Sequence, residues 1–370
     1  MKRAFFVLML CASVAFPTQV RAEAAPRRSL LVTVLQAPQV LSSREEISGL
    51  IDFSKKAGIT RLYVQVYRAN QSWFPSKVAD PAPYEACLKN VSEDPFALLI
   101  KKANAENIEV YAWLNLLSLS QNKEAPLLKK YGNSILTRNL KVKKRLEDYL
   151  IDEQYFLEPG DPRVRKELSA MVGELVSAYP ALDGVLFDYI RYPDKNPRYG
   201  YTEANIKRFA KATGSVSIRE TDPAWQEWKR NQVTGLLKEL AAKARSIRPG
   251  IRVATTGCAP YARAYYEAFQ DWQSWLSRGL IDGVTAMTYS QDIAAFKRYV
   301  LDAKRRSADF AKVDIAVGAY NLTDSPQKFI REFEFCKEAG ASSCVIFHYG
   351  SILKEPSISG FLTATAKQTK

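Results

Sequence analysis

A regular alternation of short apolar segments with amphipathic ones is the feature that most limits how this chain can fold. Eight segments rich in β-branched and aromatic residues predict strands, at 29–36, 59–67, 108–115, 183–188, 251–256, 281–289, 313–320 and 343–349. Strands that alternate with helices favour a parallel sheet covered by helices, and eight such units close the sheet into a barrel. We therefore predict a (β/α)8 TIM barrel within the α/β class.

Helix signals between the predicted strands support this interpretation. Ser43 with Glu46 forms a capping-box pattern, Gly58 follows as a stop signal, and Asp-Pro pairs begin helices at Asp94, Asp161 and Asp222. A doubly wound open sheet is the alternative, but it usually carries a glycine-rich loop after its first strand, and residues 36–38 (Gln-Ala-Pro) do not resemble one. Residues 116–158, after the third strand, form a long charged insertion, which predicts a functional or disordered loop.

The N-terminus has the pattern of a secretory signal. Lys2 and Arg3 precede an apolar run from Ala4 to Phe16, and small residues around Ala22 predict cleavage there. We expect residues 1–22 to be a signal peptide, residues 23–370 to form the barrel, and the protein to be exported to the periplasm or the extracellular space. No later segment is apolar and long enough to predict a membrane span.

Charge and residue types narrow the chemistry. Without residues 1–22 the chain loses three cations, and its net charge falls from +14 to +11. This charge favours anionic partners such as wall polymers, acidic polysaccharides or membrane surfaces, and the alternative is a solvated basic surface without a binding role. No nucleic-acid motif is present. The chain has one histidine, and Cys87, Cys258, Cys336 and Cys344 show no metal-binding spacing, so we predict neither a metal nor a cofactor. Carboxylates remain as the candidates for hydrolytic chemistry.

The segment from Leu182 to Pro193 contains the clearest of these carboxylates. Asp188 stands where the fourth strand ends, and active sites of such barrels lie at the C-terminal strand ends. Side chains alternate along a strand, so Asp188 shares a face with Leu186 and Gly184 and is predicted to point into the mouth of the barrel. The alternative is an ion pair between Asp188 and Arg191 that only fixes the loop.

Aromatic and hydrogen-bonding residues at the other strand ends suit a sugar, whose faces are partly apolar and whose rims are hydroxyls. By the same alternation, Gln65 and Tyr67 are predicted to share one face. For any single ring, core packing is the competing interpretation, and a structural role for His348 is as well supported as substrate contact. The predicted substrate-binding residues are Gln65, Tyr67, Trp113, Asn115, Tyr189, Arg191, Tyr192, Tyr289, Tyr320 and His348.

Glycoside hydrolysis usually needs a second carboxyl group. Asp292 is our prediction for it, with Asp194, Glu158 and Asp324 as the other candidates. Barrel glycosidases commonly carry their two acids at the ends of the fourth and seventh strands. The seventh predicted strand here ends in Ala319-Tyr320-Asn321 without an acid, so its position does not identify the second carboxyl group.

Four segments together resemble a known family: VQVYRANQSWFPS from Val64, DPFALLIKKANAENIEVYAWLN from Asp94, EPGDPRVRKEL from Glu158 and DGVLFDYIRYP from Asp183. They are similar to the bacterial glycosyl-hydrolase-like family ten, barrel glycosidases of the cell envelope that include a division-associated enzyme acting on peptidoglycan strands stripped of peptides. The resemblance implies a (β/α)8 barrel, polysaccharide hydrolysis, and Asp188, Trp113 and Asn115 as site residues. Tyr67 stands where many members have Arg, and Asn70-Gln71 replaces their Gly-Asp.

Two hypotheses follow. The first is an exported glycoside hydrolase of an envelope or extracellular polysaccharide, with peptidoglycan glycan strands as one candidate substrate, in which Arg191 orients Asp188 or binds an anionic substituent. The second is a catalytically silent glycan-binding or scaffold barrel at the cell wall, motivated by the unassigned partner acid and the altered second-strand loop.

Overall fold

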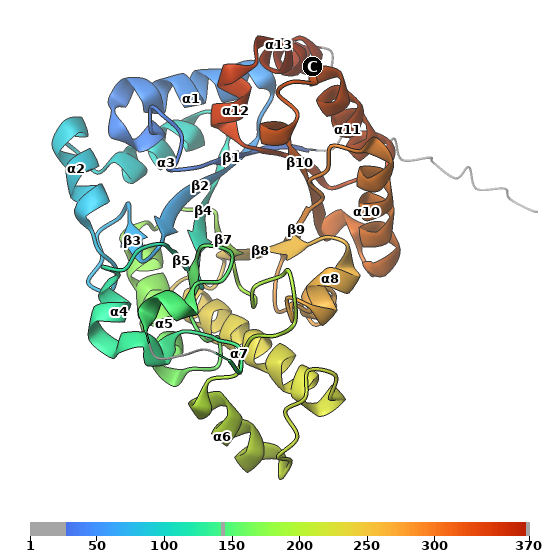
Figure 1. Cartoon of the computed structure of the whole chain (residues 1–370). Helices are drawn as coiled ribbons and strands as arrows, with labels where there is room; N and C mark the ends of the chain where they lie inside the picture. The colour runs from blue at the N-terminus through green and yellow to red at the C-terminus, as the bar shows by residue number, and fades with distance from the viewer. Residues whose placement is uncertain (1–26, 142–144, 368–370) are drawn as a thin grey trace, which may run out of the picture.

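Eight parallel strands close into a barrel in the computed structural model, which describes residues 27–141 and 145–367 (Figure 1). Strand β1 pairs with both β2 and β11, and this pairing closes the sheet and excludes the open doubly wound alternative. The short strand β3 (Gln71–Ser72) adds to β2 in the antiparallel direction. The barrel strands are β1 (Arg27–Val32), β2 (Arg61–Arg68), β4 (Glu109–Asn115), β7 (Gly184–Asp188), β8 (Arg252–Cys258), β9 (Gly283–Met287), β10 (Val313–Gly318) and β11 (Ser343–Phe347).

The predicted (β/α)8 fold is thus confirmed, and each barrel strand falls on a predicted strand. The predicted signal peptide lies outside the described residues. Within the described part of the chain, no helix combines the length and the apolar character that a membrane crossing requires.

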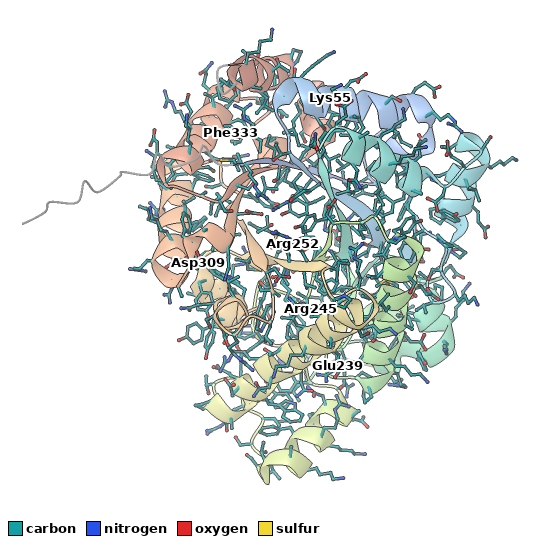
Figure 2. The ribbon with its side chains drawn as sticks, turned by 180° about the vertical axis from the view of Figure 1, so that it is seen from behind. Lys55, Glu239, Arg245, Arg252, Asp309 and Phe333 are labelled. Carbon is teal, nitrogen blue, oxygen red and sulfur yellow. The ribbon has the colours of Figure 1, made fainter. Side chains whose placement is uncertain are left out.

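Helices surround the strands, as Figure 1 and the opposite view in Figure 2 both show. Their starts follow the sequence signals: the side chains of Ser43, Asp94, Asp161 and Asp222 each accept a hydrogen bond from a backbone amide in the first turn. The predicted helices are α1 (Arg44–Ala57), α3 (Pro95–Ala105), α5 (Pro162–Ala178), α6 (Glu203–Thr213), α7 (Pro223–Ile247), α9 (Trp272–Ser277), α10 (Ile293–Arg306), α11 (Pro326–Glu338) and α13 (Pro356–Ala366).

The short elements of the loops were not predicted individually. They are the helices α2 (Ala82–Val91), α4 (Pro126–Tyr131), α8 (Tyr261–Tyr266) and α12 (Tyr349–Lys354), the strands β5 (Ser118–Ser120) and β6 (Tyr155–Phe156), and the 3-10 turns η1 (Val40–Ser42), η2 (Gly132–Ile135), η3 (Leu146–Tyr149), η4 (Phe310–Lys312) and η5 (Ala319–Asn321).

The insertion after β4 packs onto the barrel over most of its length. Strands β5 and β6 pair as a two-stranded antiparallel sheet, and the Leu157 amide donates to the Leu117 carbonyl oxygen. Leu119, Ile135 and Leu136 are fully buried in the main core. Residues 142–144 of its basic run lie outside the described residues. The insertion therefore forms one wall above the barrel mouth.

Side chains fill the inside of the barrel, so the fold has a packed interior below its mouth. Leu31, Tyr63, Tyr111, Leu186 and Val345 belong to this interior cluster. The N-terminal end is closed by a polar network in which Arg61 bridges Glu109 and Asp314, at 2.7 and 3.4 Å. This end of the barrel is built for stability, and the opposite end is open.

Candidate active site

A cleft of about 620 Å³ opens at the C-terminal ends of the barrel strands. Its floor is formed by strand-end residues of the barrel, and one wall by the insertion, through Asp152, Gln154 and Phe156. Among the residues predicted from sequence, it brings together Gln65, Trp113, Asn115, Asp188, Tyr189, Arg191, Tyr289 and Tyr320.

Asp188 lies in this cleft and is held by three hydrogen-bond donors. Its Oδ2 accepts from Trp113 Nε1 at 3.0 Å, and its Oδ1 accepts from Thr256 Oγ1 at 2.6 Å and from the Tyr189 amide at 2.7 Å. Leu186, two residues earlier, belongs to the barrel interior, as the alternation predicted. Three donors stabilise a negatively charged carboxylate and fix its orientation.

Asn115 lies directly beside Asp188, because β4 and β7 pair in parallel with these two residues in register. Its Oδ1 accepts from Gln65 Nε2 at 3.1 Å, and Gln65 Oε1 accepts from Thr33 Oγ1 at 2.9 Å. This chain of hydrogen bonds, from Thr33 just after β1 through Gln65 on β2 to Asn115 on β4, orients the Asn115 side chain at the cleft floor.

Aromatic rings form a continuous wall along the other side of the floor. Phe347 stacks on Tyr289 with 5.2 Å between ring centroids, and it meets Tyr320 and Trp113 edge-on at 5.4 and 6.0 Å. Tyr320 is 45% exposed. Burial, followed by the charge of Asp188, raises the pKa of Tyr289, so its hydroxyl stays protonated at neutral pH. Such rings are the surfaces on which sugars stack.

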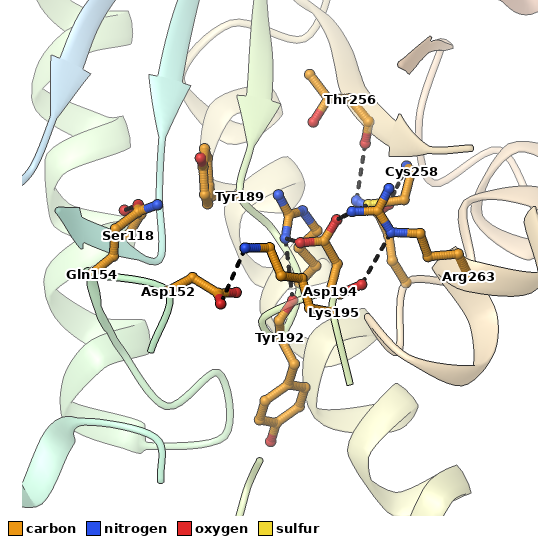
Figure 3. A network of polar contacts seen from close by, with 12 residues as sticks. Ser118, Asp152, Gln154, Tyr189, Tyr192, Asp194, Lys195, Thr256, Cys258 and Arg263 are labelled. Atoms are coloured by element: carbon orange, nitrogen blue, oxygen red, sulfur yellow. Dashed lines mark hydrogen bonds and ion pairs between the residues drawn. The ribbon is translucent and has the colours of Figure 1, made fainter. Parts of the chain in front are cut away.

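A cationic network lies on the β7–β8 side of the cleft (Figure 3). Arg191 pairs with Asp194 at 2.9 Å, and Arg263 pairs with the same carboxylate while its Nε donates to the Asp194 carbonyl oxygen at 3.0 Å. Burial opposes ionisation of Asp194, but the charges of Arg191 and Arg263 outweigh it and lower the pKa of this carboxyl group. The predicted alternative of an Asp188–Arg191 ion pair is therefore wrong, because Asp194 takes this role.

Tyr189 reaches the cleft through an unusual backbone conformation. Alternation placed it on the outer face with Val185 and Phe187, but its φ of 52° turns the side chain toward the mouth. Its ring lies 4.7 Å from the Arg191 guanidinium and 6.1 Å from Phe156 of the insertion.

The prediction that Tyr67 shares the cleft face with Gln65 is wrong. The register between β2 and β4 shifts between these two residues, so that Tyr67 turns outward into the main core, where it is fully buried. A one-residue irregularity reverses which face each later side chain takes. Its hydroxyl accepts from Asn70 Nδ2 at 3.2 Å, and the next residue, Arg68, lines the cleft instead.

Two further predicted contact residues do not line the cleft. Tyr192 is 1% exposed and donates its hydroxyl to Glu158, a fully buried carboxylate. His348 is half-buried and bonds through Nε2 to Ser351 at 3.3 Å, and burial lowers its pKa. Both side chains have structural partners within the described residues.

Asp292 is not brought to Asp188. It is exposed at the N-cap of α10, and its carboxylate accepts from the amides of Ala294 and Ala295 at 2.9 and 3.3 Å. Glu158 and Asp324 also lie outside the cleft lining. Asp194 and Asp152 are the other carboxylates at the cleft, and Asp152 pairs with Lys195 at 3.2 Å (Figure 3).

Sequence reasoning missed Asp152, Arg68 and Phe347 as cleft residues. Asp152 lies in the insertion, whose path across the barrel mouth no strand pattern predicts. Phe347 lies within the predicted strand 343–349, and its period-two relation to Val345, an interior residue, could have identified it. Within the described ranges, no group of three or more His, Cys, Asp or Glu residues could hold a metal ion, and the four cysteines there are free and buried.

Fold and cleft together define a (β/α)8 barrel with a carboxylate and aromatic rings in a cleft at the C-terminal ends of its strands. The chain belongs to the glycosyl hydrolase-like 10 family, whose model matches residues 28–324. Glycosyl hydrolase DigH of Escherichia coli K12 is a relative, with 24% identity over 278 residues that cover 69% of this chain and 60% of the relative. The match thus leaves two fifths of that relative's length without a counterpart here.

Solved structures agree on the fold. The glycoside hydrolase domain of PgaB (BpsB) from Bordetella bronchiseptica superposes with a TM-score of 0.71 at 14% identity, covering 91% of this chain and 98% of that domain. The catalytic domain of a β-amylase from Paenibacillus polymyxa gives a TM-score of 0.58 at 12% identity, over 94% of this chain and 100% of that domain. At these identities the likeness concerns the fold alone.

Proposed function

We propose that this protein is an exported glycoside hydrolase that cleaves glycosidic bonds in an envelope or extracellular polysaccharide, with peptide-free peptidoglycan glycan strands as the first candidate substrate. One observation carries the proposal: a carboxylate with three donors, Asp188, stands in a cleft walled by aromatic rings at the catalytic end of the barrel. Membership of a glycosyl hydrolase-like family supports it.

Asp188 acts on the anomeric carbon of the bound sugar. Its three hydrogen-bond donors hold both carboxylate oxygens in one orientation, which suits a nucleophile or an electrostatic stabiliser of the positively charged transition state rather than a proton donor. Trp113, Tyr289 and Tyr320 supply faces for sugar stacking, and Asn115 supplies hydrogen bonds to hydroxyl or acetamido groups.

Asp152 is our proposed proton donor. Asp194 is unsuitable, since two guanidinium groups hold it charged. The Asp152 side chain is 36% exposed, lines the cleft from the insertion, and is partnered by an exposed lysine, Lys195, that can move away when substrate binds. From the cleft wall opposite the floor residue Asp188, Asp152 is proposed to protonate the leaving oxygen of the bound sugar.

The proposed location and substrate rest on two supports. The N-terminal sequence has the pattern of an export signal, and the net charge, +14 for the whole chain and +11 without residues 1–22, favours an anionic polymer. The test is incubation of the purified protein with a panel of glycans, including peptidoglycan with and without its peptides, followed by mass analysis of products. New reducing ends on at least one envelope glycan are expected, and an unchanged panel at high enzyme concentration would contradict the proposal.

A glycan-binding barrel without catalysis is the second candidate. It is favoured by the ion pairs of Asp152 and Asp194, which leave Asp188 as the one cleft carboxylate without a cationic partner among the described residues. Under this hypothesis the protein binds a wall glycan tightly in calorimetry and releases no product over long incubation.

A further inference from the structure

Four basic side chains line the cleft: Arg68, Arg191, Lys195 and Arg263. Three of them are ion-paired within the protein: Arg191 and Arg263 share the carboxylate of Asp194, and Lys195 pairs with Asp152. Arg68 differs, because no Asp or Glu of the described ranges lies within ion-pair distance of it.

The backbone around Arg68 is fixed in the orientation that presents it to the cleft. The register shift before Tyr67 sends that ring outward and Arg68 inward. The turn that follows is anchored to the insertion, since the Ala69 carbonyl oxygen accepts from Asn122 Nδ2 at 2.8 Å and Asn70 Oδ1 accepts from the Leu127 amide at 2.9 Å. A fixed turn limits the freedom of the side chain that leaves from it, so less entropy is lost when it binds a ligand.

Arg68 shares the cleft with hydrogen-bond donors and aromatic faces, and none of the cleft carboxylates lies within ion-pair distance of it in the described ranges. Tyr189, Gln154 and Phe156 line the same cleft, and Gln154 is itself held by Ser118 Oγ at 2.6 Å from its Oε1. Burial lowers the pKa of Arg68, and the guanidinium still remains charged at neutral pH. A partly desolvated cation without a partner favours an incoming anion, and the guanidinium fork matches a carboxylate in shape.

We propose that Arg68 forms a carboxylate-binding subsite, so that the preferred substrate is a glycan whose sugars carry carboxylates, as ring uronates or as carboxyl-bearing ether substituents. This inference deepens the proposed function and rests on it, since a carboxylated glycan bound in the cleft is a substrate only if the protein hydrolyses it. It assigns to Arg68 the anion-binding role that the sequence suggested for Arg191, whose guanidinium is already ion-paired with Asp194.

The test compares binding of two matched glycans, one carrying carboxylates and one in which they have been reduced to alcohols. Calorimetry is done in an Asp188→Asn background, so that no turnover intervenes. We expect the carboxylated glycan to bind about 10- to 100-fold more tightly than the reduced one, as for hydrogen bonds to charged groups. Arg68→Gln abolishes this preference and leaves binding of the reduced glycan unchanged.

Two further variants sharpen the result. Arg68→Lys keeps the charge but loses the two-pronged geometry, so it retains only part of the preference and serves if Arg68→Gln fails to fold. Arg331→Gln removes an equal charge from an exposed position on α11 and leaves the preference intact.

Equal binding of the two glycans by the protein with Arg68 present would overturn the subsite, and so would a preference that survives Arg68→Gln. Stronger binding of a sulfated glycan than of the carboxylated one would also overturn the assignment to carboxylate. The subsite and the proposed function can fail independently. If the carboxylate preference depends on Arg68 but the wild-type protein hydrolyses no glycan, the subsite is supported and the proposed hydrolase function is contradicted.

Discussion

The hydrogen bond from Trp113 to Asp188 allows a graded test of how the carboxylate is held. Trp113 is 5% exposed, and its Nε1 lies 3.0 Å from Asp188 Oδ2. Trp113→Phe removes this donor and keeps an aromatic ring against Phe347. Because Oδ1 retains its bonds from Thr256 and the Tyr189 amide, the carboxylate stays in place but loses the protein donor on its second oxygen.

The magnitude follows from the charge on the acceptor. A hydrogen bond to a charged group contributes about 1.5–3 kcal/mol, and each 1.36 kcal/mol corresponds to about a tenfold change in rate. The cleft is open to water, which replaces part of the lost bond, so we expect kcat to fall about 10- to 50-fold. KM should change less than about threefold, since the ring that contacts the sugar is kept.

The assay is steady-state hydrolysis of the glycan identified in the panel, with Thr256→Val as the matched variant. Thr256→Val also removes one donor, but Oδ1 keeps the Tyr189 amide, so its effect on kcat should be the smaller of the two. The positioning role would be refuted if Trp113→Phe kept the wild-type kcat, or if the variant differed from wild type only by a higher KM.

Other expected outcomes address the proton donor, the pH dependence of stability and the barrel interior. Asp152→Asn should slow cleavage of natural glycans at least about 100-fold and aryl glycosides with good leaving groups far less, and equal losses on both would contradict its role. Burial raises the pKa of Glu332 from 4.5 to about 8, so the folded state keeps a proton there and stability falls as pH rises between these values. Glu332→Gln should therefore raise the thermal midpoint above wild type at about pH 9 and not at about pH 4, and parallel midpoint curves would refute this. Gly184→Ala would place a Cβ 2.4 Å from the Tyr111 ring, so urea unfolding should show a loss of about 1–3 kcal/mol, and unchanged stability would show that the ring can move freely.

The sequence was sufficient for the barrel because its signals are local. Strand alternation, Asp-Pro helix starts and the stop at Gly58 each follow from short-range physics, and eight repetitions leave few topologies. The orientation of Asp188 followed from the same alternation, since β7 has no irregularity ahead of this residue. Asp188, Trp113 and Asn115 could thus be grouped from the sequence alone.

The errors come from features that no local pattern encodes. The register shift before Tyr67 and the positive φ of Tyr189 depend on packing against the insertion and neighbouring strands, and each exchanges the face of a side chain. Asp152 reaches the cleft only through tertiary folding of the insertion. The error at Asp292 has a local cause that the sequence does encode, because an Asp directly before a helical segment is a recognisable N-cap. Asp94, Asp161 and Asp222 occupy the same position at the starts of their helices.

The central claim is that the Asp188 carboxylate performs catalysis, and one measurement tests it directly. Asp188→Asn keeps the size of the side chain and removes its charge, but its amide nitrogen cannot accept a hydrogen bond from the donors around it. Circular dichroism should therefore match wild type, while the thermal midpoint falls modestly. Initial rates on the glycan cleaved by the wild-type protein should fall by at least about 10³-fold while calorimetric binding persists. Turnover by the folded variant within about threefold of wild type would contradict the account.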